Sequence, residues 1–191
     1  MEKDKIVQHD TRNEMEREVA ECRVLFEKKT RDYGTSWRIL RLPSLTDQIF
    51  IKANRIRSVQ ESGENRVGDG LRGEFVAMVN YAVMALMQGE RLKVKGERCE
   101  IPLEEVMRQY DEQMKRVLDL MMDKNHDYGE AWRQMRISSM VDLILMKLLR
   151  IKQIEDNEGK TLVSEGVEGG YMDIINYSLF CLVRFTEESN N

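Results

Sequence analysis

The stretch that decides the fold is KNHDYGEAWRQMRISSMVDLILMKLLRI, at residues 124–151. An earlier stretch, KTRDYGTSWRILRLPSLTDQIFIKANRI at residues 29–56, matches it with thirteen identical residues at a constant offset. After a shift of one residue, Asn80 and the tyrosine that follows it recur as Asn176 and its own tyrosine. A repeat of this kind fixes the unit of the architecture. We therefore expect a module of about 90 residues that has been duplicated and fused.

The segments around the repeat are typical of helices. Apolar residues recur at steps of three and four over residues 102–122 and, less regularly, over 12–29. Two prolines and few aromatic residues argue against a sandwich of many short strands. We predict an all-α protein of two fused, pseudo-symmetric helical modules that form a bundle. The repeats are placed at 12–88 and 102–186, with a linker at 89–101.

The sequence also predicts where individual helices end and begin. The first helix of each half runs into an Asp-Tyr-Gly motif, whose Gly34 or Gly129 can take a positive φ and end the helix. The next helix should start at a serine N-cap, Ser44 or Ser139, because an aspartate follows three residues later in a variant of the capping box. Residues 140–155 are apolar on nearly every face, so we expect them at the buried centre of the bundle.

Composition narrows the class of protein. The net charge of −4 argues against a broad surface for nucleic-acid polymers, but a local cluster of cations could still hold a small anion. Cys22, Cys99 and Cys181 show no spacing typical of a disulfide framework or a zinc site. No apolar run approaches the roughly 18 residues that span a bilayer, and the polar start lacks the apolar core of a signal peptide. We expect a cytoplasmic protein without a membrane partner, and no pattern indicates its oligomeric state.

A pair of cations lies inside the most apolar predicted helix. Lys147 and Arg150 recur as Lys52 and Arg55 in the first half. Their three-residue spacing places both side chains on neighbouring positions of one helix face. Lysine as a point charge and arginine as a two-toothed donor would suit a phosphate or carboxylate group. One alternative is a structural ion pair with Asp142, Glu165 or Asp173, because buried charges need partners. The other is that the long side chains extend along apolar surface to reach water.

A second group of candidate ligand-binding residues surrounds the Asp-Tyr-Gly motif of the second half. Arg133 and Arg136 could hold phosphate, while Tyr128 and Trp132 could stack on a base. Asp127 belongs to the same motif and is included with these residues. The alternative is that the tryptophan is a core anchor of the turn and that the arginines lie over it.

The acids of the two halves differ. Glu165 and Asp173 are the candidate ligands for Mg²⁺ in the second half, with water and phosphate oxygens completing the coordination shell. The first half has Ala77 at the position that corresponds to Asp173. The second half therefore has the more complete candidate site. The alternative is that these acids only neutralise the neighbouring cations.

The order of motifs resembles a known family. KNHDYGEAW at 124–132, KLLR at 147–150 and EGVEGGYMDIINY at 165–177 resemble the nucleotide-modification-associated domain family, type one. The resemblance covers most of residues 105–185 and, in a more diverged copy, residues 15–88. It implies a link to nucleotide metabolism. More distantly, the chain is similar to all-α pyrophosphatases of the MazG and dimeric dUTPase type, although it has cations where their magnesium-binding acids stand.

The predicted function is recognition of a nucleotide or related phosphorylated small molecule, with magnesium-dependent hydrolysis of a phosphate bond as a further step. Whether the chain is an enzyme is left open. The alternative is a non-enzymatic helical interaction module, in which the repeated charges form structural networks. The two hypotheses predict different surroundings for the cations. Ligand recognition requires that they converge on an accessible cleft, whereas the interaction module requires that each is paired and shielded from solvent.

Overall fold

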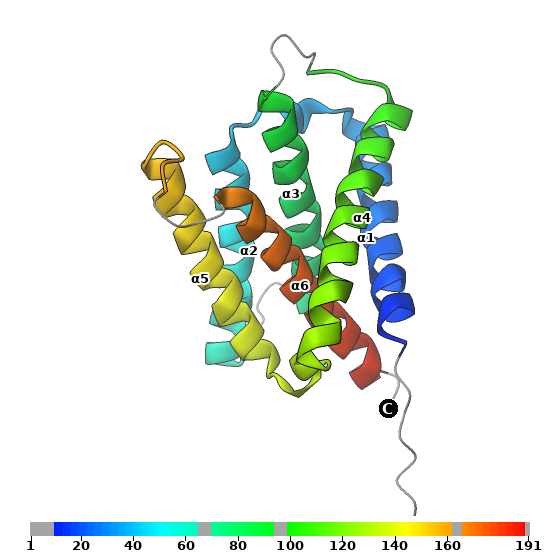
Figure 1. Cartoon of the computed structure of the whole chain (residues 1–191), viewed down its shortest axis with the longest axis vertical. Coiled ribbons are helices and arrows are strands. Elements are labelled where there is room, and N and C mark those ends of the chain that lie inside the picture. Colours follow the sequence, from blue (N-terminus) through cyan, green and yellow to red (C-terminus); the bar gives the residue numbers. More distant parts are fainter. Residues whose placement is uncertain (1–9, 65–69, 94–98, 162–165, 190–191) are drawn as a thin grey trace, which may run out of the picture.

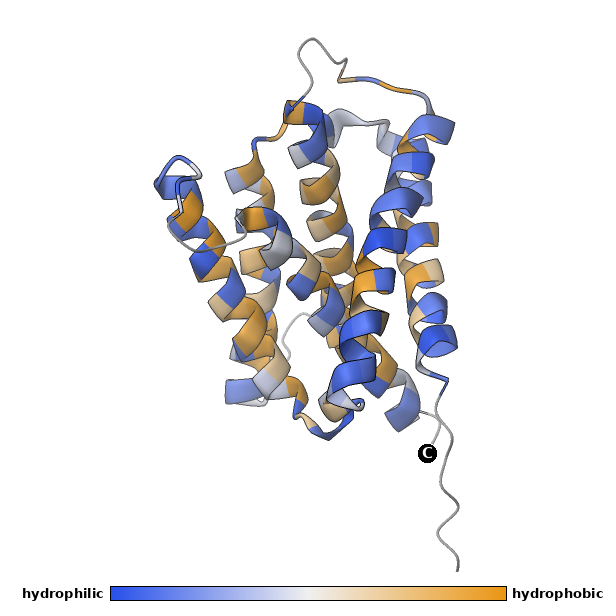
Figure 2. Ribbon diagram, in the orientation of Figure 1, coloured by the Kyte–Doolittle hydropathy of each residue, from blue (hydrophilic) through white to orange (hydrophobic). Residues whose placement is uncertain are grey.

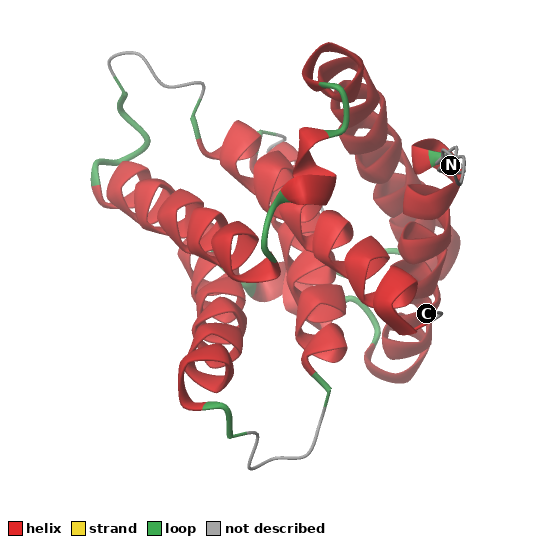
Figure 3. Cartoon of the chain, turned by 90° about the horizontal axis from the view of Figure 1, so that it is seen from below, coloured by secondary structure: helices red, strands yellow, loops and turns green. Residues whose placement is uncertain are grey.

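The computed structural model describes residues 10–64, 70–93, 99–161 and 166–189, and in these ranges it contains helices and no strands (Figures 1 and 3). The fold is all-α, as predicted. In chain order the helices are α1 (Thr11–Tyr33), the 3-10 helix η1 (Ser36–Ile39), α2 (Leu42–Ser62), α3 (Leu71–Leu92), α4 (Leu103–Tyr128), the 3-10 helix η2 (Ala131–Gln134), α5 (Ile137–Asp156) and α6 (Val167–Ser189). Among them, no helix combines the length and apolar character that a membrane span requires.

The two halves have the same order of helices and matching contacts. Helices α1, α2 and α3 correspond to α4, α5 and α6. Exchanging the halves turns each helix–helix contact into another one that is present: α2–α3 into α5–α6, α1–α6 into α4–α3, and α1–α3 into α4–α6. The remaining pairs, α1–α4, α2–α5 and α3–α6, join corresponding helices across the pseudo-twofold axis. Because α1 and α4 each pack on the last helix of both halves, the modules share one core.

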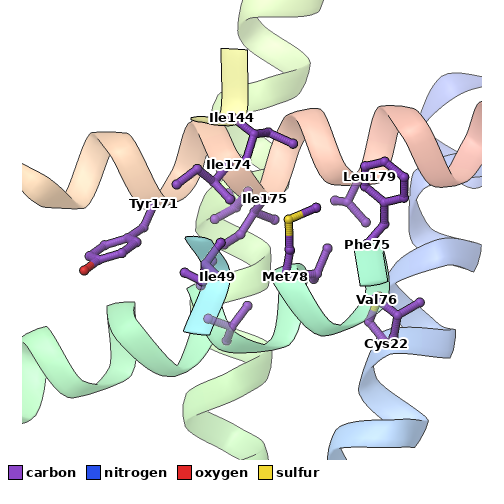
Figure 4. Packing of buried hydrophobic residues seen from close by; sticks show 14 of the residues in the cluster. Cys22, Ile49, Phe75, Val76, Met78, Ile144, Tyr171, Ile174, Ile175 and Leu179 are labelled. Carbon is purple, nitrogen blue, oxygen red and sulfur yellow. The ribbon is translucent and has the colours of Figure 1, made fainter. Parts of the chain in front are cut away.

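The centre of the bundle is formed by α3 and α6, which lie between the α1–α4 pair and the α2–α5 pair (Figure 1). Their apolar side chains, such as Met78 and Ile175, interdigitate with Ile49 of α2 and Ile144 of α5 (Figure 4). The hydrophilic residues gather on the outer faces of the helices (Figure 2). The prediction that residues 140–155 form the buried centre is wrong, because α5 packs only one face on α6 and α2 and leaves Leu149 59% exposed.

The predicted ends of the first helices are confirmed. Gly34 has a φ of 62° and Gly129 a φ of 57°, and each residue caps the helix before it. The predicted serine N-caps are wrong. Helices α2 and α5 begin at Leu42 and Ile137, with their N-caps three residues before the predicted serines, and no side chain caps either start. The aspartates of the expected capping boxes instead form ion pairs between α2 and α5, Asp47 with Lys152 and Asp142 with Arg57.

The repeated arginines of the two 3-10 helices tie the halves together. Arg38 donates to Gln109 of α4, and the corresponding Arg133 donates to Glu14, the corresponding residue of α1. Each 3-10 helix is also held from the last helix of its own half. Gln88 donates to the carbonyl oxygens of Arg38 and Leu40, and Arg184 donates to those of Arg133 and Met135. The repetition of these arginines therefore has a structural cause.

Candidate functional site

A groove runs between α4, α5 and α6 in the second half of the chain. It consists of two adjoining cavities, of about 320 and 570 Å³, which share Lys124 and Asp173 as lining residues. The smaller cavity also contains Lys147 and Arg150, and we call it the cationic cavity. The larger one contains Trp132, Tyr128, Tyr177, Phe180 and Asn176, and we call it the aromatic cavity. Two of the predicted cations thus line one of two adjoining cavities, and two of the predicted aromatic residues line the other.

Asp173 lies between two lysines where the cavities meet. Its Oδ2 is 2.6 Å from Nζ of Lys147, and its Oδ1 is 3.6 Å from Nζ of Lys124. Arg150 is exposed at the rim of the cationic cavity and has no ion-pair partner among the described residues. The cationic cavity therefore has three positively charged side chains, of which Asp173 engages two.

Glycine brings the first turn of α6 close to α5 in this cavity. A Cβ atom built on Gly170 would lie 2.9 Å from two side-chain carbons of Ile151, which is too close for any other residue without movement. The backbone of Gly169 and Gly170 therefore lines the cavity directly. The first turn of a helix carries unpaired N–H groups and favours anions.

In the first half, an acid at a different position neutralises the corresponding cation pair. Glu74, which corresponds to Gly170, forms ion pairs with Lys52, at 3.1 Å, and with Arg55. It lies one helical turn before Ala77, the counterpart of Asp173. The first half thus keeps a carboxylate against its cation pair, although Asp173 itself is not duplicated.

Trp132 is an anchor of the core, and its stacking faces are both occupied. Phe180 stacks on it with ring centroids 4.5 Å apart and an interplanar angle of 9°. The guanidinium carbon of Arg133 lies 4.3 Å from the centroid of the same ring, so it must cover the other face. The indole N–H donates to Asn125 at 3.1 Å. The predicted role of Trp132 as a stacking surface is therefore corrected, and Tyr128 and Tyr177 are the rings that remain.

The structure does not bring Arg133 and Arg136 to the groove. Arg133 is surrounded by the carboxylates of Glu14, Glu130 and Glu187, which balance its charge. Arg136 is exposed just before α5 and lies outside both cavities. Both arginines were predicted to hold phosphate. The ion pairs of Arg133 give it a structural role.

The two tyrosines differ in their surroundings. Tyr128 and the neighbouring Asp127 are exposed at the mouth of the aromatic cavity. Tyr177 is partly buried and packs edge-on against Phe180, with ring centroids 6.1 Å apart. Burial raises the pKa of Tyr177, and the negative charge of Asp173 raises it further. Tyr177 therefore keeps its proton and can donate a hydrogen bond at neutral pH.

Of the two predicted metal ligands, only Asp173 lies among the described residues. Glu165 lies outside the described residues, and Asp173 is engaged by two ammonium groups. Glu168, at the edge of the cationic cavity, is paired with Arg116. Within the described ranges, no three His, Cys, Asp or Glu side chains cluster in a way that could hold a metal ion. The magnesium site stays a prediction that depends on Glu165.

Among the groove residues that were not predicted as site residues are three polar ones: Lys124, Asn176 and Tyr177. All three belong to the internal repeat, as counterparts of Lys29, Asn80 and Tyr81. The signal that could have found them was thus present, but the sequence does not show that α4 and α6 place them on one groove.

Comparison with known families agrees with the internal repeat. The sequence pattern of the family described as nucleotide modification associated domain 1 matches residues 29–88 and again residues 124–185, together more than half of the chain. No curated protein and no solved structure matches the chain. The similarity to MazG-type pyrophosphatases stays a prediction. The chain belongs to the nucleotide modification associated domain 1 family and carries its domain twice.

Proposed function

We propose that the groove of the second half binds a nucleotide or a related phosphorylated small molecule. The observation that carries this proposal is the junction of a cationic cavity with an aromatic cavity at Lys124 and Asp173. A nucleotide has the same division, with an anionic phosphate at one end and a planar base at the other. Membership of a nucleotide-modification-associated family agrees with such a ligand.

The phosphate end would occupy the cationic cavity. Lys147, Lys124 and Arg150 come from two helices and converge on the first turn of α6. Charged donors and the N-terminal N–H groups of a helix favour phosphate oxygens together. Glu168 opposes them, but Arg116 engages its carboxylate.

Asp173 would act as an internal competitor for the phosphate. Its carboxylate engages the two lysines that the phosphate would use, at 2.6 and 3.6 Å. Binding would exchange one anionic partner for another and would leave Asp173 to rearrange or to accept a hydrogen bond. Magnesium-dependent hydrolysis remains a separate proposal, in which Asp173 and Glu165 would hold the metal while the cations hold phosphate.

The second candidate function is a non-enzymatic interaction module with structural charge networks. The observation that favours it is the Arg133 cluster, where three carboxylates neutralise a residue that had been assigned to phosphate. It does not explain the groove, because Arg150 stays unpaired there among the described residues.

A thermal-shift titration tests the proposal. The probes are the common nucleoside mono- and triphosphates, each added with EDTA or with Mg²⁺. A ligand at 100 times its Kd adds about 2.7 kcal/mol of stability. We expect stabilisation in EDTA, which weakens as salt rises, because the contacts are ionic.

The Asp173→Asn variant separates the two roles of the acid. If Asp173 competes with phosphate, this variant binds more tightly than the wild type in EDTA. If Asp173 holds magnesium, the variant loses the part of the binding that depends on Mg²⁺. A wild-type protein that none of these nucleotides stabilises would refute the proposed function and favour the interaction module.

A further inference from the structure

Asn176 is a buried amide whose oxygen has no hydrogen-bond partner among the residues that the structure describes. The residue lines the aromatic cavity and is only 7% exposed. The Oδ1 atom is fully enclosed and accepts no hydrogen bond within the described part of the chain. A buried polar atom of this kind costs free energy, so its presence needs an explanation other than stability.

The corresponding amide of the first half is fully engaged. Asn80 donates to the carbonyl oxygen of Cys22 at 3.0 Å and accepts from the hydroxyl of Tyr110 at 2.8 Å. Tyr110 stacks on Phe26, with ring centroids 4.7 Å apart. Where the first half has Phe26, the second half has Met121, and the counterpart of Tyr110 is Met15. The second half thus lacks the hydroxyl that satisfies the amide oxygen of the first.

The place of Asn176 on α6 connects it to the phosphate end of the groove. Gly170, Asp173 and Asn176 follow at intervals of three residues, so they lie along one face of the helix. Gly170 lines the cationic cavity, Asp173 lines both cavities, and Asn176 lines the aromatic one. A ligand that runs along this face would meet positive charge first and the amide one or two turns later.

The chemistry of the unpaired Oδ1 atom indicates which part of the ligand it would contact. An amide oxygen accepts hydrogen bonds and needs an N–H or O–H group. An ionised phosphate offers only acceptors, so it cannot satisfy Oδ1. The planar rings of Tyr128 and Tyr177, which line the same cavity as Asn176, suit a flat heterocycle more than a sugar.

We propose that the Asn176 amide turns toward the aromatic cavity and reads the edge of a nucleobase, its oxygen accepting a hydrogen bond from a base N–H group while the phosphate lies at Lys147. This inference rests on the proposed nucleotide binding and adds the part of the ligand that gives selectivity. A site built to bond a ligand N–H discriminates strongly against ligands that lack it. The first half, with its amide already engaged, would not read a base.

Two leucine variants test the inference, because leucine resembles asparagine in shape. Asn176→Leu removes an unsatisfied group, so its melting temperature should equal or exceed that of the wild type. The matched control, Asn80→Leu, breaks two buried hydrogen bonds and should melt at a lower temperature. A fall in melting temperature for Asn176→Leu as large as that for Asn80→Leu would overturn the inference. Asn176→Ala repeats the comparison with a smaller side chain.

Binding of defined probes completes the test. The probes are the 5′-monophosphates of adenosine, guanosine, cytidine, uridine and thymidine, with ribose 5-phosphate as the base-free control. Asn176→Leu should weaken the best nucleotide by about tenfold and leave ribose 5-phosphate unchanged. Equal weakening of ribose 5-phosphate would assign the amide to a sugar hydroxyl and overturn the base assignment.

The failure of this inference can be told apart from failure of the proposed function. If Lys147→Met loses nucleotide binding while Asn176→Leu keeps wild-type affinity, the groove binds nucleotides but Asn176 does not read the base. If the wild type binds none of the nucleotides, both proposals are overturned.

Discussion

Glu74 neutralises the cation pair of the first half, Lys52 and Arg55, and this explains why both cations are kept there. Its carboxylate pairs with Lys52 at 3.1 Å and with Arg55, and the residue is 9% exposed. Glu74→Gln keeps the shape and one acceptor oxygen but removes the negative charge. The two cations, which are themselves mostly buried, would then lose the carboxylate that they share.

The expected loss lies between two known limits. Exposed ion pairs contribute about 0.2–1 kcal/mol, whereas breaking a buried pair costs about 3–5 kcal/mol. The side chains of Lys52 and Arg55 retain 31% and 24% of their exposure, so solvent screens part of the interaction. We therefore expect Glu74→Gln to destabilise the protein by about 2 kcal/mol. For a chain of this size, that corresponds to a fall in melting temperature of about 4–8 °C.

Urea unfolding at neutral pH measures this loss, with Glu61→Gln as the matched control. Glu61 lies in the same half and pairs with Arg57, but both side chains are at least half exposed. Its substitution should leave the unfolding midpoint unchanged. If the two glutamine variants unfold at the same urea concentration, the buried carboxylate does not stabilise the cation pair and the explanation is refuted.

Three further predictions concern local features. Gly129→Ala should cost about 1 kcal/mol in urea unfolding, because alanine disfavours a φ of 57°; an unchanged midpoint would contradict this. Burial raises the pKa of the Cys22 and Cys181 thiols to about 12, so a thiol reagent at pH 8 should modify only the exposed Cys99 in the folded protein and all three cysteines after unfolding. Burial also raises the pKa of Glu155, so the stability that its protonation provides is lost as pH rises through the folded-state pKa. Glu155→Gln should therefore stabilise the protein at pH 7, with a difference from the wild type that shrinks as pH falls below the ordinary glutamate pKa; a difference that does not vary with pH would contradict the argument.

The sequence predicts most of the fold because the repeat and the helical periodicity are local signals. The ends of α1 and α4 follow from Gly34 and Gly129, whose positive φ is a property of the backbone alone. The starts of α2 and α5 were misplaced, because the aspartates that suggest a capping box instead form ion pairs between these two helices. Which face of α5 is buried depends on α2 and α6, and the apolar pattern of α5 does not identify it.

The candidate site is only partly predictable for the same reason. Lys147 and Asp173 were both singled out from the sequence, and their ion pair was one of the alternatives. The cluster around Arg133 joins residues more than a hundred positions apart, so nothing near Arg133 indicates that Glu14 neutralises it. The orphaned oxygen of Asn176 becomes visible only when the second half is compared with the first in three dimensions.

The pseudo-twofold symmetry supplies the most direct test of the central claim that the second half carries the ligand site. Lys147→Met and Lys52→Met make the same change at corresponding positions of the two halves. Isothermal titration calorimetry with the nucleotide that most stabilises the wild type should show that Lys147→Met weakens binding at least tenfold and that Lys52→Met leaves it unchanged. Equal losses in the two variants, or a loss confined to Lys52→Met, would contradict the assignment of the site to the groove between α4, α5 and α6.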